Sequence, residues 1–309
     1  MTGSPLVGNK YVLCNEIGRG QFGIVYKGEH VKHRTPVAIK MEHTNQSLNT
    51  IKYETTILNY LYSNGCRVIP AVLWYGIYGD YKCLTMDYYN QTVDQYIALV
   101  RTKYAGSPID YLKQIIKILM NMVNILAEVH KHQIIHRDIK PDNFMLKNGE
   151  IHLVDFGIAI SVLSTEDINK EPYRDTIIGS PKYVSYHVHQ GYEPMYRDDL
   201  ISVGYCFFYF TNNELPWSNI PPLDNMGSQT GSSELHLLHE KNLFRKKGKQ
   251  WSNIEAIMHQ YIEKWGDNYD PQYKQVYTNI YEYFSLCYGL QIHETPYYDE
   301  LYRVLQMSL

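Results

Sequence analysis

The chain lacks several features that would place it in a broad class at once. No apolar run approaches the roughly 18 residues that a membrane-spanning helix needs. Residues 1–5 lack the charged and apolar segments of a secretory leader, and no myristoylation or prenylation motif is present. We therefore expect no membrane span and no membrane anchor.

Charge of one sign is not in excess either, since 29 lysines and arginines face 32 acidic residues. This balance gives no general attraction to nucleic acid or to anionic lipid, so we expect neither as a partner. Cysteine is scarce, and no two cysteines are spaced as a metal-binding pair. The five are Cys14, Cys66, Cys83, Cys206 and Cys287. This usage indicates a reduced, intracellular protein of the cytoplasm or the nucleus.

What is present is a change of pattern along the chain. Its 309 residues, 44% of them hydrophobic, can bury a large core in one domain or in two lobes. Five short β-rich runs come first, with one helical segment among them, and predict a small, mostly antiparallel sheet. These runs are residues 11–17, 23–28, 36–41, 71–78 and 82–86.

The second part of the chain, from about residue 91, is mainly helical in pattern. Apolar residues recur at intervals of three and four from Leu112 to His130, and residues 200–210 are apolar on every face, which predicts a central helix. Residues 219–233 are rich in Pro, Gly, Ser and Asn and predict a flexible loop. A basic run from Lys241 to Lys249 follows, and a solvated face is its simplest interpretation.

A glycine-rich loop lies between the first two predicted strands. Residues 18–23 read Gly-Arg-Gly-Gln-Phe-Gly, and glycines let backbone amides approach phosphates closely. The same glycines also serve ordinary hairpins, so the loop alone leaves both interpretations open. A dinucleotide-binding loop would open a helix rather than a second strand, so that alternative is excluded by context.

A lysine and a glutamate form the next candidate pair. Lys40 ends an apolar strand, where a solvated surface lysine is the ordinary case. Glu54, however, shares an inward helical stripe with Ile51 and Leu58. A buried carboxylate needs a partner, and Lys40 is the obvious candidate. Together they would hold a cation against the phosphates of a nucleotide.

Four polar residues follow the apolar run 133–135 at a functional spacing. They are Asp138, Lys140, Asn143 and Asp155, and each one alone is more often a turn or a cap. Phosphoryl transfer requires a carboxylate to orient the attacking hydroxyl and oxygen ligands for magnesium. We assign these roles to Asp138 and to the pair Asn143 and Asp155, and Lys140 adds a positive charge for the transferring phosphate.

Taken together, these residues resemble the motif series of eukaryotic protein kinases, from Ile17 to about Leu305. Finer features are similar to the casein kinase 1 family. Residues 140–144, Lys-Pro-Asp-Asn-Phe, resemble that family's catalytic loop in its serine/threonine form. Where most kinases carry Ala-Pro-Glu, residues 185–187 read Ser-Tyr-His, close to the family's Ser-Ile-Asn. Further matches lie at 172–174, 179–183 and 197–204.

The resemblance implies an α+β fold with two lobes, ATP and Mg²⁺ as cofactors, and protein Ser/Thr hydroxyls as substrates of a monomer. It places a small β-rich lobe at about 1–88, a hinge at about 87–90 and a larger, mainly α-helical lobe at about 91–309. Met86 would be the gatekeeper, and Val25, Ala38 and Met145 would sandwich the adenine, although core packing also explains such apolar residues. The implied nucleotide-binding residues are Ile17, Gly18, Gly20, Gly23, Val25, Ala38, Lys40, Met86, Asp87, Tyr89 and Met145.

The departures from the family pattern concern substrate choice and regulation. Arg137 and Lys182 remain from the basic cluster that reads acidic or phosphorylated residues, but Ile160 stands where that family has lysine. A preference for acidic substrates is therefore not implied, unless the basic run at 241–249 replaces the lost charges. The long C-terminal tail of some members is missing, so we expect constitutive activity.

Two other functional classes remain possible from the sequence. A pseudokinase scaffold would bind partners without chemistry, but such proteins usually lose one of the residues that Lys40, Asp138 and Asp155 represent here. A small-molecule kinase would share the same acids. The long segment 155–187 and the helix that carries Asp199 favour a protein substrate instead.

Overall fold

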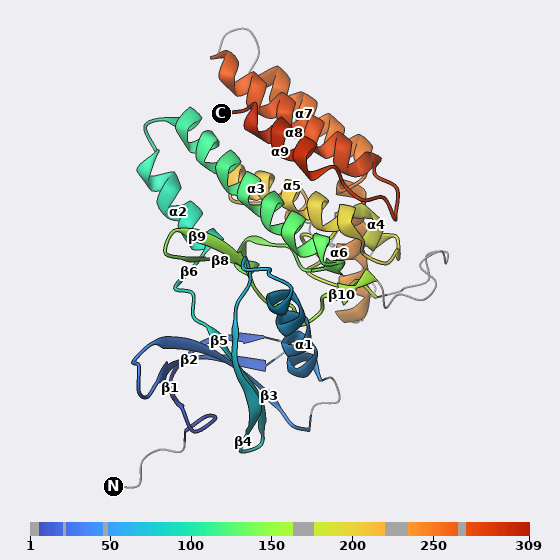
Figure 1. Ribbon diagram of the computed structural model, residues 1–309. Helices are drawn as coiled ribbons and strands as arrows, with labels where there is room; N and C mark the ends of the chain where they lie inside the picture. Colours follow the sequence, from blue (N-terminus) through green and yellow to red (C-terminus); the bar gives the residue numbers. More distant parts are fainter. Residues whose placement is uncertain (1–5, 21–22, 46–48, 163–175, 220–233, 265–269) are drawn as a thin grey trace.

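The computed structural model describes residues 6–20, 23–45, 49–162, 176–219, 234–264 and 270–309. Within these residues a β-sheet region comes first and a helical region follows (Figure 1). The predicted loop at 220–233 and the motif at 172–174 lie outside the described residues. No helix of the described part is long and apolar enough to cross a membrane.

The predicted antiparallel sheet is present, and each of its five strands lies within a few residues of its expected bounds. Neighbouring strands pair in the order β1-β2-β3-β5-β4, all antiparallel. The strands are β1 (Tyr11–Gly20), β2 (Gly23–His30), β3 (Pro36–His43), β4 (Val72–Tyr78) and β5 (Tyr81–Asp87). The helix predicted among them, α1 (Thr50–Ser63), packs against β3, β4 and β5.

The central strand β3 positions Lys40. Because side chains alternate along a strand, Val37 and Ile39 face one small apolar cluster, while Ala38 belongs to the main core on the other face. Lys40 shares the face of Ala38, and it is 6% exposed. Burial of β3 on both faces therefore carries the lysine into the interior rather than to the surface.

The helical region contains the long helices that periodicity predicts, joined by short strands. The helices are α2 (Val93–Lys103), α3 (Pro108–Lys131), α4 (Tyr186–His189), α5 (Tyr196–Asn212), α6 (Glu234–Gly248), α7 (Trp251–Lys264), α8 (Pro271–Gly289) and α9 (Tyr298–Gln306). The short strands are β6 (Gln91–Thr92), β7 (Ile134–Ile135), β8 (Phe144–Lys147), β9 (Glu150–Leu153) and β10 (Ile160–Ser161), and a 3₁₀ turn spans Pro141–Asn143.

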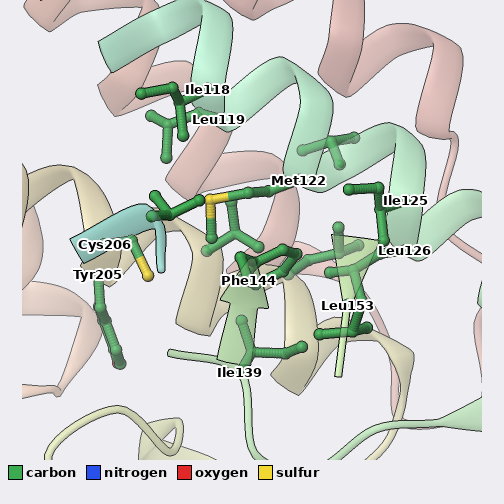
Figure 2. Packing of buried hydrophobic residues seen from close by; sticks show 14 of the residues in the cluster. Ile118, Leu119, Met122, Ile125, Leu126, Ile139, Phe144, Leu153, Tyr205 and Cys206 are labelled. Carbon is green, nitrogen blue, oxygen red and sulfur yellow. The ribbon is translucent and has the colours of Figure 1, made fainter. Parts of the chain in front are cut away.

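The core of the helical region forms where α3, α5 and the β8–β9 hairpin meet. Figure 2 shows Phe144 of β8 among Met122 and Leu126 of α3 and Leu153 of β9. Helix α5 is buried from Tyr196 to Phe208 on every face, as its composition predicts. The hairpin of β8 and β9 is thereby fixed to α3, and it supports the loop that precedes it.

Candidate active site

A cleft of about 920 Å³ is lined by residues of both regions. Every nucleotide-binding residue expected from the sequence lies along it. From the β-sheet region and the connection after it come Ile17, Gly18, Gly20, Gly23, Val25, Ala38, Lys40, Met86, Asp87 and Tyr89, and from the helical region comes Met145. The strands and the β8–β9 hairpin thus bring residues more than a hundred positions apart to one cavity.

Lys40 lies between two carboxylates in this cleft. Its Nζ is 2.7 Å from Oε2 of Glu54 and 2.6 Å from Oδ1 of Asp155, so the expected Lys40–Glu54 pair is present. Burial alone would lower the pKa of Lys40, but the charges of Glu54 and Asp155 outweigh it and raise that pKa. The lysine is therefore a permanent cation at the back of the cleft.

Asp155 is held in a left-handed backbone conformation, with φ of 66°. Burial would raise its pKa, but the charge and hydrogen bond of Lys40 lower it, so the carboxylate stays ionised. The next residue, Phe156, is fully buried, stacks edge-on with His136 and donates its amide to Oε1 of Glu54 at 3.1 Å. These contacts join the segment that carries Asp155 to helix α1.

Asp138 is not among the residues that line the cleft, but it is hydrogen-bonded to Lys140 and Asn143, which are. It is 7% exposed. Its Oδ2 accepts hydrogen bonds from Nζ of Lys140 at 2.6 Å and from Nδ2 of Asn143 at 3.0 Å, and its Oδ1 accepts from the amide of Ser180 at 2.9 Å. The carboxylate is thus oriented by three donors from two different loops.

Asn143 and Asp155 offer the oxygen atoms that magnesium prefers. The Nδ2 of Asn143 is committed to Asp138, which leaves its Oδ1 available as a ligand. The described residues contain no group of three or more His, Cys, Asp or Glu that would hold a metal unaided. Magnesium in nucleotide-binding proteins is usually held by one or two carboxylates together with substrate phosphates and water.

Asp199 is a structural residue of the site whose partners the sequence did not indicate. From the buried helix α5, its carboxylate accepts the backbone amides of His136 at 2.8 Å and Arg137 at 3.0 Å, and it contacts His130 Nε2 at 3.0 Å. Arg137 has a left-handed φ of 70°, which these bonds stabilise. The motif match at 197–204 and an acidic pair in an otherwise apolar helix were the signals that pointed to this residue.

Arg137 also bonds to residues that no motif indicates. Its Nη1 lies 2.6 Å from Oε1 of Glu193, and its Nε donates to the carbonyl of Ile158 at 2.6 Å. Both charged side chains are largely buried, with 13% and 11% exposure. The guanidinium is therefore paired with a carboxylate of the chain's own, 56 residues further on.

The residues after Met86 are fixed by side-chain contacts. Asp87 accepts the amide of Ala71 at 2.9 Å and pairs with Lys147 at 2.7 Å. Tyr89 is 5% exposed, and burial raises the pKa of its hydroxyl. The side chains of Asp87 and Tyr89 thus fix the connection between the two regions.

The positions at which the sequence suggested basic residues for substrate recognition differ in part from expectation. Ile160 packs with Ile135 and Met195 in an apolar cluster, which explains why no lysine stands there. Lys182 and Arg245 line the far end of the cleft. The interpretation of the run 241–249 as a solvated face is wrong for Lys249, which has 0% exposure.

A comparison with known families agrees with this geometry. Residues 11–279 match the family model described as protein kinase domain. The match covers most of the chain, and the five-stranded sheet followed by a helical region fits the two-lobed kinase fold. Such a domain implies ATP and Mg²⁺ as cofactors and proteins as substrates. The chain therefore belongs to the protein kinase family, whose members are phosphotransferases.

Proposed function

We propose that the protein is an ATP-dependent serine/threonine kinase of casein kinase 1 type. It transfers the γ-phosphate of ATP to a Ser or Thr hydroxyl of a protein substrate. The observation that carries this proposal is the Asp138 carboxylate, held by Lys140 and Asn143 and by the amide of Ser180. These contacts join the proposed base, cation and metal ligand in one hydrogen-bonded group, of which Lys140, Asn143 and Ser180 line the cleft.

In the proposed mechanism, each residue performs a task for which its contacts suit it. Bound Mg-ATP supplies the phosphoryl group and the positive charge of the metal. Lys40, oriented by Glu54, presents its cation to the phosphates. Asp138 orients the attacking hydroxyl and accepts its proton.

The remaining residues bind the cofactor. Asn143 and Asp155 would hold the metal, and the cation of Lys140 would lie near the charge of the transferring group. Val25, Ala38 and Met145 enclose the adenine, with Met86 as gatekeeper. Ile17 and the glycines of the loop at 18–23 cover the nucleotide, and the backbone from Asp87 to Tyr89 provides the edge on which its base is recognised.

The proposal extends to the domain organisation. The N-lobe spans about 1–88, the hinge about 87–90 and the C-lobe about 91–309, in a protein that acts as a monomer in the cytoplasm or nucleus. The end of β5 at Asp87 and the start of β6 at Gln91 support the hinge. The serine/threonine assignment rests on Lys140, two residues after Asp138.

We also propose that activity requires no phosphorylation of the segment after Asp155. In many kinases a phosphate orders this segment by pairing with arginine. Here the Arg137 guanidinium is already paired with Glu193 at 2.6 Å. A permanent carboxylate would take the place of the added phosphate.

The proposed function is tested by incubating the protein with labelled ATP, magnesium and paired Ser/Thr peptides, acidic or phosphorylated against neutral. We expect transfer by the wild type and a loss of at least ~10²-fold in Asp138→Asn, with ATP affinity retained. Asp299→Asn, an exposed acid of α9, is the matched control. Transfer without acidic preference would agree with the apolar surroundings of Ile160.

The alternative is a pseudokinase scaffold. Nucleotide binding without transfer to any peptide, or to the protein itself, would favour that alternative. Near-normal turnover in Asp138→Asn would show that the role given to this residue is wrong.

A further inference from the structure

We propose that Lys249 is a positioning residue for the phosphoryl transfer proposed above. Its amine holds the backbone of residues 180–184, named here the anchored segment, in place beside Asp138. The inference starts from an unusual burial, because a lysine side chain with 0% exposure is rare in a protein core.

The surroundings of the Lys249 amine supply acceptors and aromatic faces. Its Nζ donates to the carbonyls of Val184 at 2.6 Å and Pro181 at 2.9 Å, and it lies 3.2 Å from Nε2 of His189. The rings of Trp217 and Tyr205 lie 5.2 Å and 5.4 Å from the nitrogen. Burial and the charge of Arg245 lower the pKa of Lys249, and both protonation states keep two N–H donors for the two carbonyls.

The carbonyls of Lys182 and Tyr183, between these two contacts, are also bonded by side chains of the helical region, whereas the carbonyl of Ser180 accepts the amides of Tyr183 and Val184. Trp217 donates its indole N–H to the carbonyl of Lys182 at 2.7 Å, and Ser202 donates its hydroxyl to that of Tyr183 at 2.8 Å. Within the described residues the segment pairs with no strand, so its buried carbonyls depend on such donors. Lys249 joins the carbonyls of Pro181 and Val184, which are three residues apart, while Nε2 of His189 also lies 3.3 Å from the Pro181 carbonyl.

The opposite side of the anchored segment touches the catalytic group. The amide of Ser180 donates to Oδ1 of Asp138 at 2.9 Å, and Lys140 donates to the hydroxyl of Ser180 at 3.1 Å. Pro181, whose carbonyl accepts from Lys249, directly follows Ser180 in the chain. The position of the segment, and hence the orientation of Asp138 toward a substrate hydroxyl, is therefore coupled to Lys249.

The experiment compares three variants. Lys249→Met removes the donors and keeps the apolar stem, and Lys249→Arg keeps a charged donor. Lys247→Met is an exposed control from the last turn of α6, two residues before Lys249. If Lys249→Met does not fold, Lys249→Gln, which keeps one amide donor group, replaces it. Peptide kinetics, ATP affinity by calorimetry and hydrogen–deuterium exchange over 180–184 are measured for each.

We expect Lys249→Met to lower kcat/KM for the peptide on the order of 10²-fold, because small displacements from the reactive geometry have effects of this size. ATP affinity should stay within about twofold, since Lys249 does not line the nucleotide cleft. Exchange should accelerate in the anchored segment, while the core of α3 stays protected. Lys249→Arg should restore part of the loss, and Lys247→Met should match the wild type.

Two results would overturn the inference. One is wild-type peptide kinetics and wild-type exchange in Lys249→Met. The other is a parallel fall in ATP affinity, peptide turnover and protection throughout the protein, which would make Lys249 a residue of general stability. A wild type that transfers no phosphate would instead refute the proposed function, whereas the exchange measurement, which needs no turnover, still decides whether Lys249 holds the segment.

Discussion

Lys40 carries its charge into a nearly dry site because two carboxylates surround it. Glu54 has 0% exposure, and its Oε2 faces Nζ of Lys40 at 2.7 Å. A buried ion pair of this kind contributes little when intact but much when one partner is removed, since the remaining charge has lost its compensation. Its effect on stability is therefore best measured by removing the two charges separately and together.

We expect Lys40→Met to destabilise the protein by about 3 kcal/mol, because it leaves the carboxylate of Glu54 buried and unpaired. Adding Glu54→Gln in the double variant should recover more than half of that loss, since Gln keeps an acceptor for the amide of Phe156. Urea unfolding of the four proteins in the cycle measures the coupling. If the two single variants lose unfolding free energies that simply add up in the double variant, Lys40 and Glu54 are not energetically coupled.

His187 gives a prediction for pH dependence. Burial, and to a lesser degree Arg197, lower its pKa from 6.5 to about 4, and its Nε2 has no hydrogen-bond partner among the described residues. Between pH 6.5 and 4 the unfolded chain therefore binds a proton that the folded protein does not. Stability is lost as pH falls through this window, by roughly 2 kcal/mol between pH 7 and pH 5.

His187→Phe removes this titration, so its unfolding free energy should fall less from pH 7 to pH 5 than that of the wild type. Burial raises the pKa of Asp198 to about 6, which acts in the opposite direction, but this acid is present in both proteins and cancels in the comparison. Denaturant unfolding at the two pH values measures the difference. Parallel pH profiles would rule out a contribution from His187.

At the scale of elements, the site is assembled by loops that rigid elements support. The catalytic loop lies between β7 and β8, and helix α5 holds its backbone through Asp199. Gly179 lies against the same loop, with a left-handed φ of 93°. A Cβ atom at Gly179 would stand 2.3 Å from the carbonyl oxygen of Arg137, which backbone atoms cannot accommodate without a shift.

Gly179→Ala should therefore displace the anchored segment from the catalytic loop and reduce peptide turnover by at least ~10-fold. Gly149→Ala is the matched control, because it has a similar φ of 84° but nothing within 4 Å of the added Cβ. Both should lower stability by about 1 kcal/mol or more through backbone strain. Equal turnover in the two variants would show that the contact of Gly179 with the loop that carries Asp138 does not affect catalysis.

At the scale of the whole molecule, the sheet and the helical region share one cleft, and charges from both regions close it. Lys40 of β3 meets Asp155, which follows β9, at 2.6 Å. Arg137 and Glu193 join the catalytic loop to the segment before α5. Both of these contacts are made by side chains of the chain itself, without an added phosphate.

The purified protein should consequently keep its activity, within about twofold, after treatment with phosphatase. Glu193→Gln should lower turnover by about tenfold, because it removes the carboxylate that pairs with the Arg137 guanidinium. Peptide phosphorylation before and after treatment provides the measurement. A large and lasting loss in the treated wild type would disprove constitutive activity.

Much of this architecture was predictable because the signals are local. The inward stripe of α1 predicted that Glu54 is buried and that Lys40 is its partner, and both side chains are buried and paired. Composition predicted that α5 is surrounded by protein, and its residues from Tyr196 to Phe208 are all buried. Spacing placed Asp138, Asn143 and Asp155 in connecting segments, and the β8–β9 hairpin brings them together.

The sequence by itself determined which residues face inward and which belong to the kinase motifs, because periodicity and spacing are properties of neighbouring residues. Only the tertiary structure decided their distant partners. Asp199 meets Arg137 across 62 positions, Glu193 meets it across 56, and Lys249 meets Val184 across 65. Local pattern indicated that Glu54 is buried but not that Lys249 is, and the partners of both depend on how the helices pack, which no short window of sequence records.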